Sequence, residues 1–231
     1  MDSKRKTAII VGVLFITALV SSMQSGSFLE SINEPDYLTS VSANDKQVVT
    51  GVLLMVVLTA SVAAIPIMMF PILREHNESL ALMYVGARIF EGFFDIILAL
   101  SQLLILTLSR GFVDAAAPVA PYFQTSGALI KAVHSWSSIL ENFPYCAGAL
   151  IFYYLLYRSR LIPRWLSGWG FLGAALFLAT APFRMFDLLP PLAVVLAVPL
   201  ILNELVLAIW LIVKGFNSSA IASESVKTDT N

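Results

Sequence analysis

The chain has 231 residues, of which 58% are hydrophobic and 13% are charged, and its mean hydropathy is +0.83. Soluble domains are close to half apolar and a quarter charged, so a soluble fold of this length could not bury so much apolar surface. The net charge of −1 and the scattered basic residues exclude a nucleic-acid partner, and the only cysteine, Cys146, cannot form an intramolecular disulfide.

The first apolar segment covers residues 7–23 and follows Lys4, Arg5 and Lys6. A basic start followed by an apolar core is also typical of a secretory signal peptide. However, Val20-Ser21-Ser22 makes a poor cleavage site, and further apolar segments come later in the chain. We therefore predict an uncleaved first membrane helix.

Five more segments have the length and apolar character of a membrane span, which takes roughly 20 residues as a helix. They are residues 47–73, 81–108, 130–156, 165–186 and 192–213. Lipid offers the backbone no hydrogen-bond partner, so such segments must be helical. We predict an all-α, polytopic membrane helical bundle with six transmembrane helices, in a single domain over residues 1–216. The lipid bilayer is the one partner that this composition requires.

The polar segments between these spans are predicted as loops. Residues 24–46 form an acidic loop, and residues 109–128, with Ala115-Ala116-Ala117-Pro118, form a longer one. The last segment, 217–231, is rich in Ser, Thr, Lys and Asp and is predicted to be a disordered cytoplasmic tail.

The distribution of basic residues predicts the orientation of the bundle, because cytoplasmic loops carry an excess of Lys and Arg. With the N-terminus inside, the cytoplasmic segments hold Lys4, Arg5, Lys6, Arg74, Arg158, Arg160, Arg164, Lys214 and Lys227. The outer segments hold Lys46, Arg110, Lys131 and Arg184. This bias favours both termini in the cytoplasm.

Two stretches carry a resemblance to a known family. The first runs from Tyr157 to Gly170 and reads YRSRLIPRWLSGWG. The second combines Asn203-Glu204-Leu205 with WLIVKGF over residues 210–216. Both resemble the uncharacterised bacterial membrane proteins grouped as domain of unknown function 4386, over about residues 4–216. The resemblance implies a multi-pass protein of the bacterial plasma membrane and implies no reaction.

Polar groups at membrane depth are rare, because insertion scales give each charge a cost of about 2.5–3.5 kcal/mol. Three of the predicted helices carry such groups. On two of them the groups recur at helical spacing, which places them along one face. The candidate site residues are Arg88, Glu91 and Asp95 in 81–108, His134, Glu141 and Asn142 in 130–156, and Asn203 and Glu204 in 192–213.

Asp95, Glu141 and Glu204 fall near the centres of their spans, so three helices could bring carboxylates to one layer. Three carboxylates cannot all stay ionised cheaply at low dielectric, so we expect one of them to hold a proton or a cation to occupy the site. Pro144 and Pro199 lie near Glu141 and Glu204 and remove backbone amides, which leaves carbonyl oxygens that an ion or proton site can use.

We therefore predict a buried acidic site that binds a cation or a proton, with a transporter-like role and no cofactor. One alternative is a non-catalytic membrane sensor or assembly partner, in which the same groups pair with one another and lock the helix packing. An intramembrane enzyme is disfavoured because no catalytic motif is present. Gly168-x-Gly170-x-x-Gly173 matches the dinucleotide fingerprint by letter but follows no strand, so it predicts close helix packing.

Overall fold

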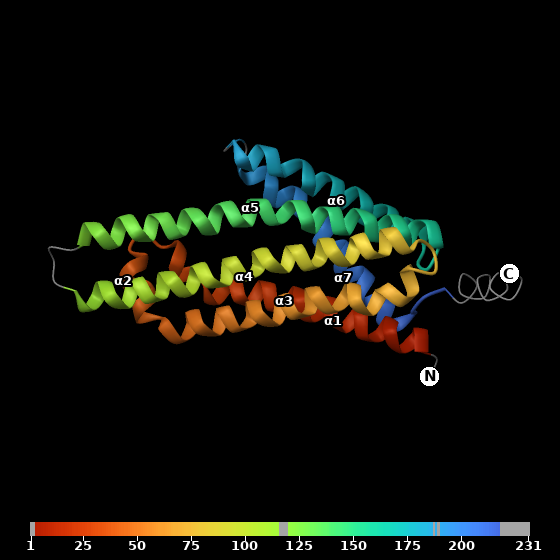
Figure 1. Ribbon diagram of the computed structural model, residues 1–231, viewed down its shortest axis with the longest axis horizontal. Helices are drawn as coiled ribbons and strands as arrows, with labels where there is room; N and C mark the ends of the chain where they lie inside the picture. Colours follow the sequence, from red (N-terminus) through yellow and green to blue (C-terminus); the bar gives the residue numbers. More distant parts are fainter. Residues whose placement is uncertain (1–2, 116–119, 187, 189, 218–231) are drawn as a thin grey trace, which may run out of the picture. The chain divides into compact units, whose positions relative to one another are not determined.

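The computed structural model describes residues 3–115, 120–186, 188 and 190–217, and these residues form helices and their connections, without strands (Figure 1). In chain order the elements are α1 (Ser3–Phe28), the short 3₁₀ helix η1 (Glu30–Asn33), α2 (Tyr37–Ala43), α3 (Asp45–Leu73), α4 (Glu78–Asp114), α5 (Ala120–Ser159), α6 (Arg164–Met185) and α7 (Pro190–Val213). The predicted all-α fold is therefore confirmed.

Six of these helices, α1 and α3 to α7, are long and apolar enough to cross a membrane. Each covers one of the six predicted spans, and together they have the length and composition that a multi-pass membrane protein requires. Of the predicted cytoplasmic tail, residues 218–231 lie outside the described residues.

The prediction that residues 109–128 form a loop was wrong. Helix α4 continues to Asp114 and α5 begins at Ala120, so most of that segment is helical. The acidic segment 24–46 likewise holds the end of α1, η1 and α2 rather than an open loop. The physical reason is that hydropathy marks the lipid-embedded part of a helix and not the residue where the helix ends. With 37 and 40 residues, α4 and α5 are about 55–60 Å long, whereas a bilayer with its headgroups is about 40–45 Å thick.

The chain divides into two compact units. Unit 1 comprises Met1–Ile16, Ser61–Glu91 and Asn142–Asn231, and unit 2 comprises Thr17–Ala60 and Gly92–Glu141. Helices α1, α3, α4 and α5 each contribute a segment to both units. Helices α6 and α7 belong to unit 1 alone, whereas η1 and α2 belong to unit 2 alone.

The core of unit 1 is apolar and rich in aromatic rings. The Tyr84 and Phe152 rings stack with centroids 4.9 Å apart, and Phe15 lies on the same cluster. At one end of the unit, Arg5 donates hydrogen bonds to the carbonyl oxygens of the last residues of α7, from Leu211 to Val213. These carbonyls have no partner within the helix, so the guanidinium both satisfies them and complements the negative end of the helix dipole.

Close helix packing in unit 1 uses two of the three glycines in the fingerprint-like sequence of α6. A Cβ on Gly170 would lie 2.3 Å from the Tyr153 ring, and one on Gly173 would lie 3.2 Å from the backbone of Leu200. The packing interpretation is confirmed for these two positions. Gly168 has open space around it and plays no such part.

The core of unit 2 joins the end of α1 to α3 and α4. Its buried members include Leu29, Val52 and Ile105. Here α1 approaches α3 closely, because a Cβ on Gly51 would lie 2.7 Å from the Leu29 side chain, and the Ser25 hydroxyl donates to the Gly51 carbonyl (2.9 Å).

The segment formed by η1 and α2 is attached to the long helices of unit 2 by polar contacts. The Lys131 ammonium donates to the Ile32 carbonyl (3.0 Å) and lies 4.4 Å from the centre of the Tyr37 ring. The Ser109 hydroxyl donates to the carbonyl of Leu38 in α2. We name this segment, residues 30–43, the cap of unit 2.

Candidate functional site

Unit 2 contains a cavity of about 290 Å³ beside the cap. All of the elements of this unit except α2 contribute to its wall. The lining residues are Ser22, Ser25 and Gly26 of α1, Leu29 between α1 and η1, Ile32 and Asn33 of η1, Met55 and Leu58 of α3, Asp95, Leu98 and Gln102 of α4, and His134, Ser138 and Glu141 of α5. Three of the predicted site residues, Asp95, His134 and Glu141, therefore line one cavity.

Asp95 is almost fully buried, with 3% of its surface exposed. The Thr59 hydroxyl lies 3.3 Å from a carboxylate oxygen of Asp95 and 2.9 Å from the Met55 carbonyl, so its single proton is shared between the two acceptors. The α3–α4 approach is close at this point, because a Cβ on Gly92 would lie 3.4 Å from Thr59. Asp95 is thus an acid whose position is fixed by the neighbouring helix.

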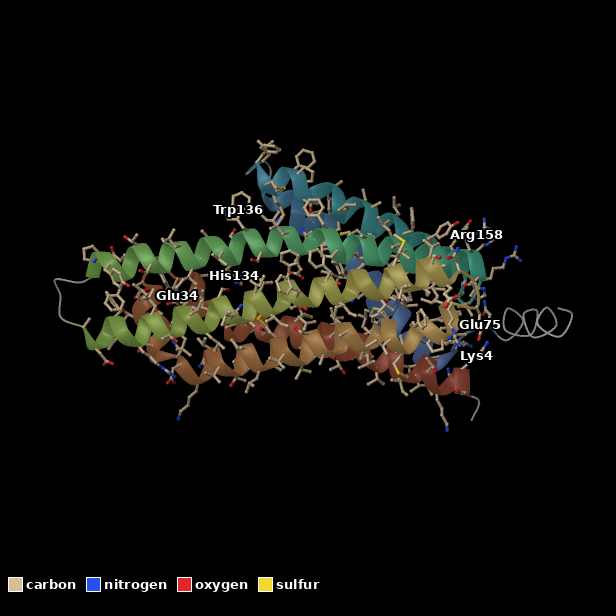
Figure 2. All side chains as sticks on the ribbon, in the orientation of Figure 1. Lys4, Glu34, Glu75, His134, Trp136 and Arg158 are labelled. Atoms are coloured by element: carbon tan, nitrogen blue, oxygen red, sulfur yellow. The ribbon has the colours of Figure 1, made fainter. Side chains whose placement is uncertain are left out.

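His134 is oriented by a chain of two hydrogen bonds. Its Nδ1 lies 3.0 Å from the Ser101 hydroxyl oxygen, and that hydroxyl donates to the Leu98 carbonyl (2.7 Å). When the Ser101 hydroxyl donates to Leu98, Nδ1 of His134 is the donor in this contact, and in the other tautomer the hydroxyl donates to Nδ1. Figure 2 shows His134 on the side of α5 toward α4, whereas Trp136 lies on the opposite side.

The side chain of Gln102 places a buried atom without a described partner in this wall. It is 5% exposed, and its Oε1 is buried without a hydrogen bond to any described residue. A buried amide oxygen without a partner costs free energy of about 1–3 kcal/mol, so such atoms are rare unless something else binds them. A helical period of 3.6 residues places Gln102 on the same face as Asp95, but the missing partner is visible only in the structure.

A second polar cluster lies in unit 1. Arg88 and Glu91 form a buried ion pair (2.9 Å), and the Arg88 guanidinium lies 5.3 Å from the centre of the Tyr145 ring. The Tyr145 hydroxyl in turn donates to the Glu204 carboxylate (2.9 Å). The Arg88 side chain runs against Gly148, where a Cβ would lie 3.1 Å from it.

This cluster leaves little room for a ligand. The void that Arg88, Tyr153 and Glu204 help to line has a volume of about 10 Å³, which is about the space that one water molecule needs. The charged groups of this cluster thus contact mainly other protein groups, which is typical of residues that hold helices together. They are Arg88, Glu91 and Glu204.

The two predicted asparagines also belong to unit 1. The Asn203 side-chain amide donates to the Leu166 carbonyl (2.9 Å) and is fully buried. Asn142 is buried, and its Nδ2 has no hydrogen-bond partner among the residues that the structure describes. Neither lines the cavity of unit 2. Of the three predicted central acids, Asp95 and Glu141 thus line that cavity, and Glu204 belongs to the cluster of unit 1.

Several wall residues had not been predicted, among them Ser25 and Asn33. The available signal was the serine-rich end of the first apolar segment, Ser21 to Ser27, which is unusual within a membrane span. Within residues 3–115, 120–186, 188 and 190–217, no group of three or more His, Cys, Asp or Glu side chains is placed to hold a metal ion.

The comparisons with known proteins identify a family and no activity. No curated protein and no solved structure matches the chain. The family described as domain of unknown function (DUF4386) matches residues 10–215, which covers the last five spans in full, most of the first, and both polar clusters. The chain therefore belongs to the DUF4386 family.

Proposed function

We propose that this protein binds a small cation or a proton in the cavity of unit 2 and has a transporter-like role in the bacterial plasma membrane. The observation that carries the proposal is the chemistry of the wall. Asp95 and Glu141 supply carboxylates, Gln102 supplies an amide oxygen, and no Lys or Arg occurs among the described residues that line the cavity. Such a wall offers acceptors and negative charge, which favour a cation over an anion.

The location of the cavity within the helices supports the proposal. Ionisable groups in membrane helices face the interior of the bundle or a water-filled space, and they mark ion and proton pathways more often than they mark packing sites. Asp95 and Glu141 lie within the candidate spans of α4 and α5. Both termini are proposed to lie in the cytoplasm, on the basis of the excess of basic residues in the segments assigned there.

Thermal unfolding of the purified protein in detergent tests this proposal. The transition is measured with Na⁺, K⁺, Ca²⁺, Mg²⁺ and Zn²⁺ at several pH values, for the parent and for Asp95→Asn and Glu141→Gln. A ligand that prefers the folded state stabilises it in proportion to the logarithm of its concentration. We expect one cation to raise the midpoint in the parent and to lose this effect in both variants. If a proton alone binds, the midpoint depends on pH and not on the cation.

Two controls separate the cavity from other acids. Glu78→Gln removes an exposed carboxylate at the start of α4, and Glu204→Gln changes the cluster of unit 1. Both should keep the cation response of the parent. The proposal is wrong if Asp95→Asn and Glu141→Gln match the parent in every condition. In that case, the acids stabilise packing, as they would in a sensor or an assembly partner.

A further inference from the structure

The hydrogen-bonding character of the wall points to a narrower ligand class than any cation. His134 lines the same wall, with its Nδ1 3.0 Å from the Ser101 hydroxyl oxygen. Gln102 presents a buried amide oxygen that no described residue satisfies. With the carboxylates of Asp95 and Glu141, acceptors come from both α4 and α5. These acceptors suit a ligand that carries hydrogen-bond donors as well as positive charge.

The cavity is larger than a bare metal ion needs, so it has space for a larger organic cation. Its volume of about 290 Å³ is near the lower end for small-molecule pockets, which span about 300–1,000 Å³. A metal ion would contact only a small part of this wall, and no described group of three His, Cys, Asp or Glu residues is placed to hold one. Apolar side chains also line the cavity, among them Leu29, Met55 and Leu98, and these suit a hydrocarbon body rather than a hydrated ion.

We infer that the cavity of unit 2 binds a small protonated amine, with its ammonium N–H groups donating to the acceptors on α4 and α5 and its hydrocarbon part against the apolar wall. The inference rests on the proposed function and specifies the ligand class of the same site. An ammonium group has three donors and no acceptor, which matches the two carboxylates and the amide oxygen of this wall. Hydrogen bonds between a charged and a neutral group contribute more than neutral ones, so this pairing gives selectivity over Na⁺ and K⁺.

A pair of isomeric cations tests the role of the N–H donors. Butylammonium and tetramethylammonium have the same formula and charge, but only butylammonium has N–H groups. Both are titrated at millimolar concentration and constant ionic strength against the protein in lipid-free detergent micelles, with the unfolding midpoint and calorimetric binding as readouts. We expect butylammonium to bind saturably and to raise the midpoint, and tetramethylammonium to bind at least tenfold more weakly. Equal effects of the two isomers would overturn the inference.

The variant Gln102→Leu tests the site itself. Gln102 has no hydrogen bond to a described residue, so leucine should fold at least as well. Loss of one hydrogen bond to a charged ligand weakens binding by roughly tenfold or more. Butylammonium affinity should therefore fall in Gln102→Leu and remain unchanged in the surface control Glu78→Gln. An unchanged affinity in Gln102→Leu would show that the amide does not bind the ligand and would contradict the inference.

The outcomes also separate this inference from the proposed function. If Na⁺ or K⁺ stabilises the protein through Asp95 and butylammonium does not, the cation site stands and the ligand class is wrong. If no cation of either kind changes the midpoint or binds, and the midpoint does not depend on pH, both are wrong.

Discussion

The side-chain amide of Asn203 in α7 donates a hydrogen bond of 2.9 Å to the backbone carbonyl of Leu166 in α6, at a position fully buried in unit 1. Both residues come from the two stretches on which the family resemblance was recognised. A second contact joins the same stretches, because the Trp165 and Trp210 rings meet edge to face with centroids 6.5 Å apart. The two sequence hallmarks are therefore the two sides of one helix contact, and their first role is structural.

The first prediction concerns this hydrogen bond. Asn203→Asp replaces the donating N–H group by an oxygen opposite the Leu166 carbonyl oxygen and introduces an uncompensated buried charge. We expect the free energy of unfolding to fall by on the order of 3 kcal/mol, measured by chemical unfolding in detergent. Asn217→Asp is the matched control, because the Asn217 amide donates to the Arg160 carbonyl at an exposed position (2.7 Å). Its loss should be about 1 kcal/mol or less. Equal losses would show that burial of Asn203 does not matter.

The second prediction uses two glycines on one turn of α6. Gly170→Ala places a Cβ 2.3 Å from the buried Tyr153 ring, so either the ring or the two helices must shift to accommodate it. We expect it to lower the free energy of unfolding by roughly 1–3 kcal/mol, the usual range for overpacking. Gly168→Ala meets open space and should raise it by up to about 1 kcal/mol through helix propensity. Thermal unfolding of the two variants side by side checks the sign. A stabilising Gly170→Ala would mean that α5 and α6 pack less closely than the structure shows.

The sequence predicts the spans of this fold well and the helix ends poorly. Apolar content depends on contact with lipid, so each of the six predicted spans corresponds to a helix. Helix α4 nevertheless continues past the apolar segment to Asp114, where the Arg110–Asp45 ion pair (3.1 Å) and the Ser109–Leu38 contact are made with protein partners. Hydropathy contains no information on such contacts, so the extended helix ends and the cap could not be predicted from it.

Helical spacing predicts only part of the candidate site. A period of 3.6 residues places Asp95 and Gln102 on one face of α4, and both line the cavity. Spacing within a helix says nothing of which faces meet, however, and depth along the chain alone suggested a common layer for Asp95 and Glu204. Glu204 is hydrogen-bonded to Tyr145 in unit 1, a partner that depends on how α5 and α7 pack. Tertiary packing therefore decides which polar residues share a site.

The third prediction is the membrane orientation. Nine basic residues in the segments assigned to the cytoplasm against four outside favour the N-in and C-in topology. Reporter fusions after residues 76, 160 and 220 should report the cytoplasm, and fusions after residues 36 and 115 should report the outside. An inverted pattern would contradict the topology and would place the cap, residues 30–43, on the cytoplasmic side.

The last prediction concerns the Tyr145–Glu204 pair of unit 1. If this bond holds α5 against α7, loss of its donor lowers the free energy of unfolding, and a double-mutant cycle with Glu204→Gln shows whether the acceptor is charged. Tyr145→Phe keeps the ring beside Arg88 and removes only the donating hydroxyl, while Glu204→Gln keeps an acceptor oxygen and removes the charge. A hydrogen bond to an ionised carboxylate is worth about 1.5–3 kcal/mol and one to a neutral group about 0.5–1.5 kcal/mol. We therefore expect Tyr145→Phe to destabilise the parent more than it destabilises Glu204→Gln if Glu204 is ionised, and by the same amount if Glu204 holds a proton. The free energies of unfolding of the parent, the two single variants and the double variant distinguish these cases.

Tyr157→Phe, on the exposed end of the same helix, controls for loss of a tyrosine hydroxyl. If Tyr145→Phe costs no more than Tyr157→Phe in either background, the bond contributes nothing to the packing of unit 1, and its role in holding α5 against α7 is rejected.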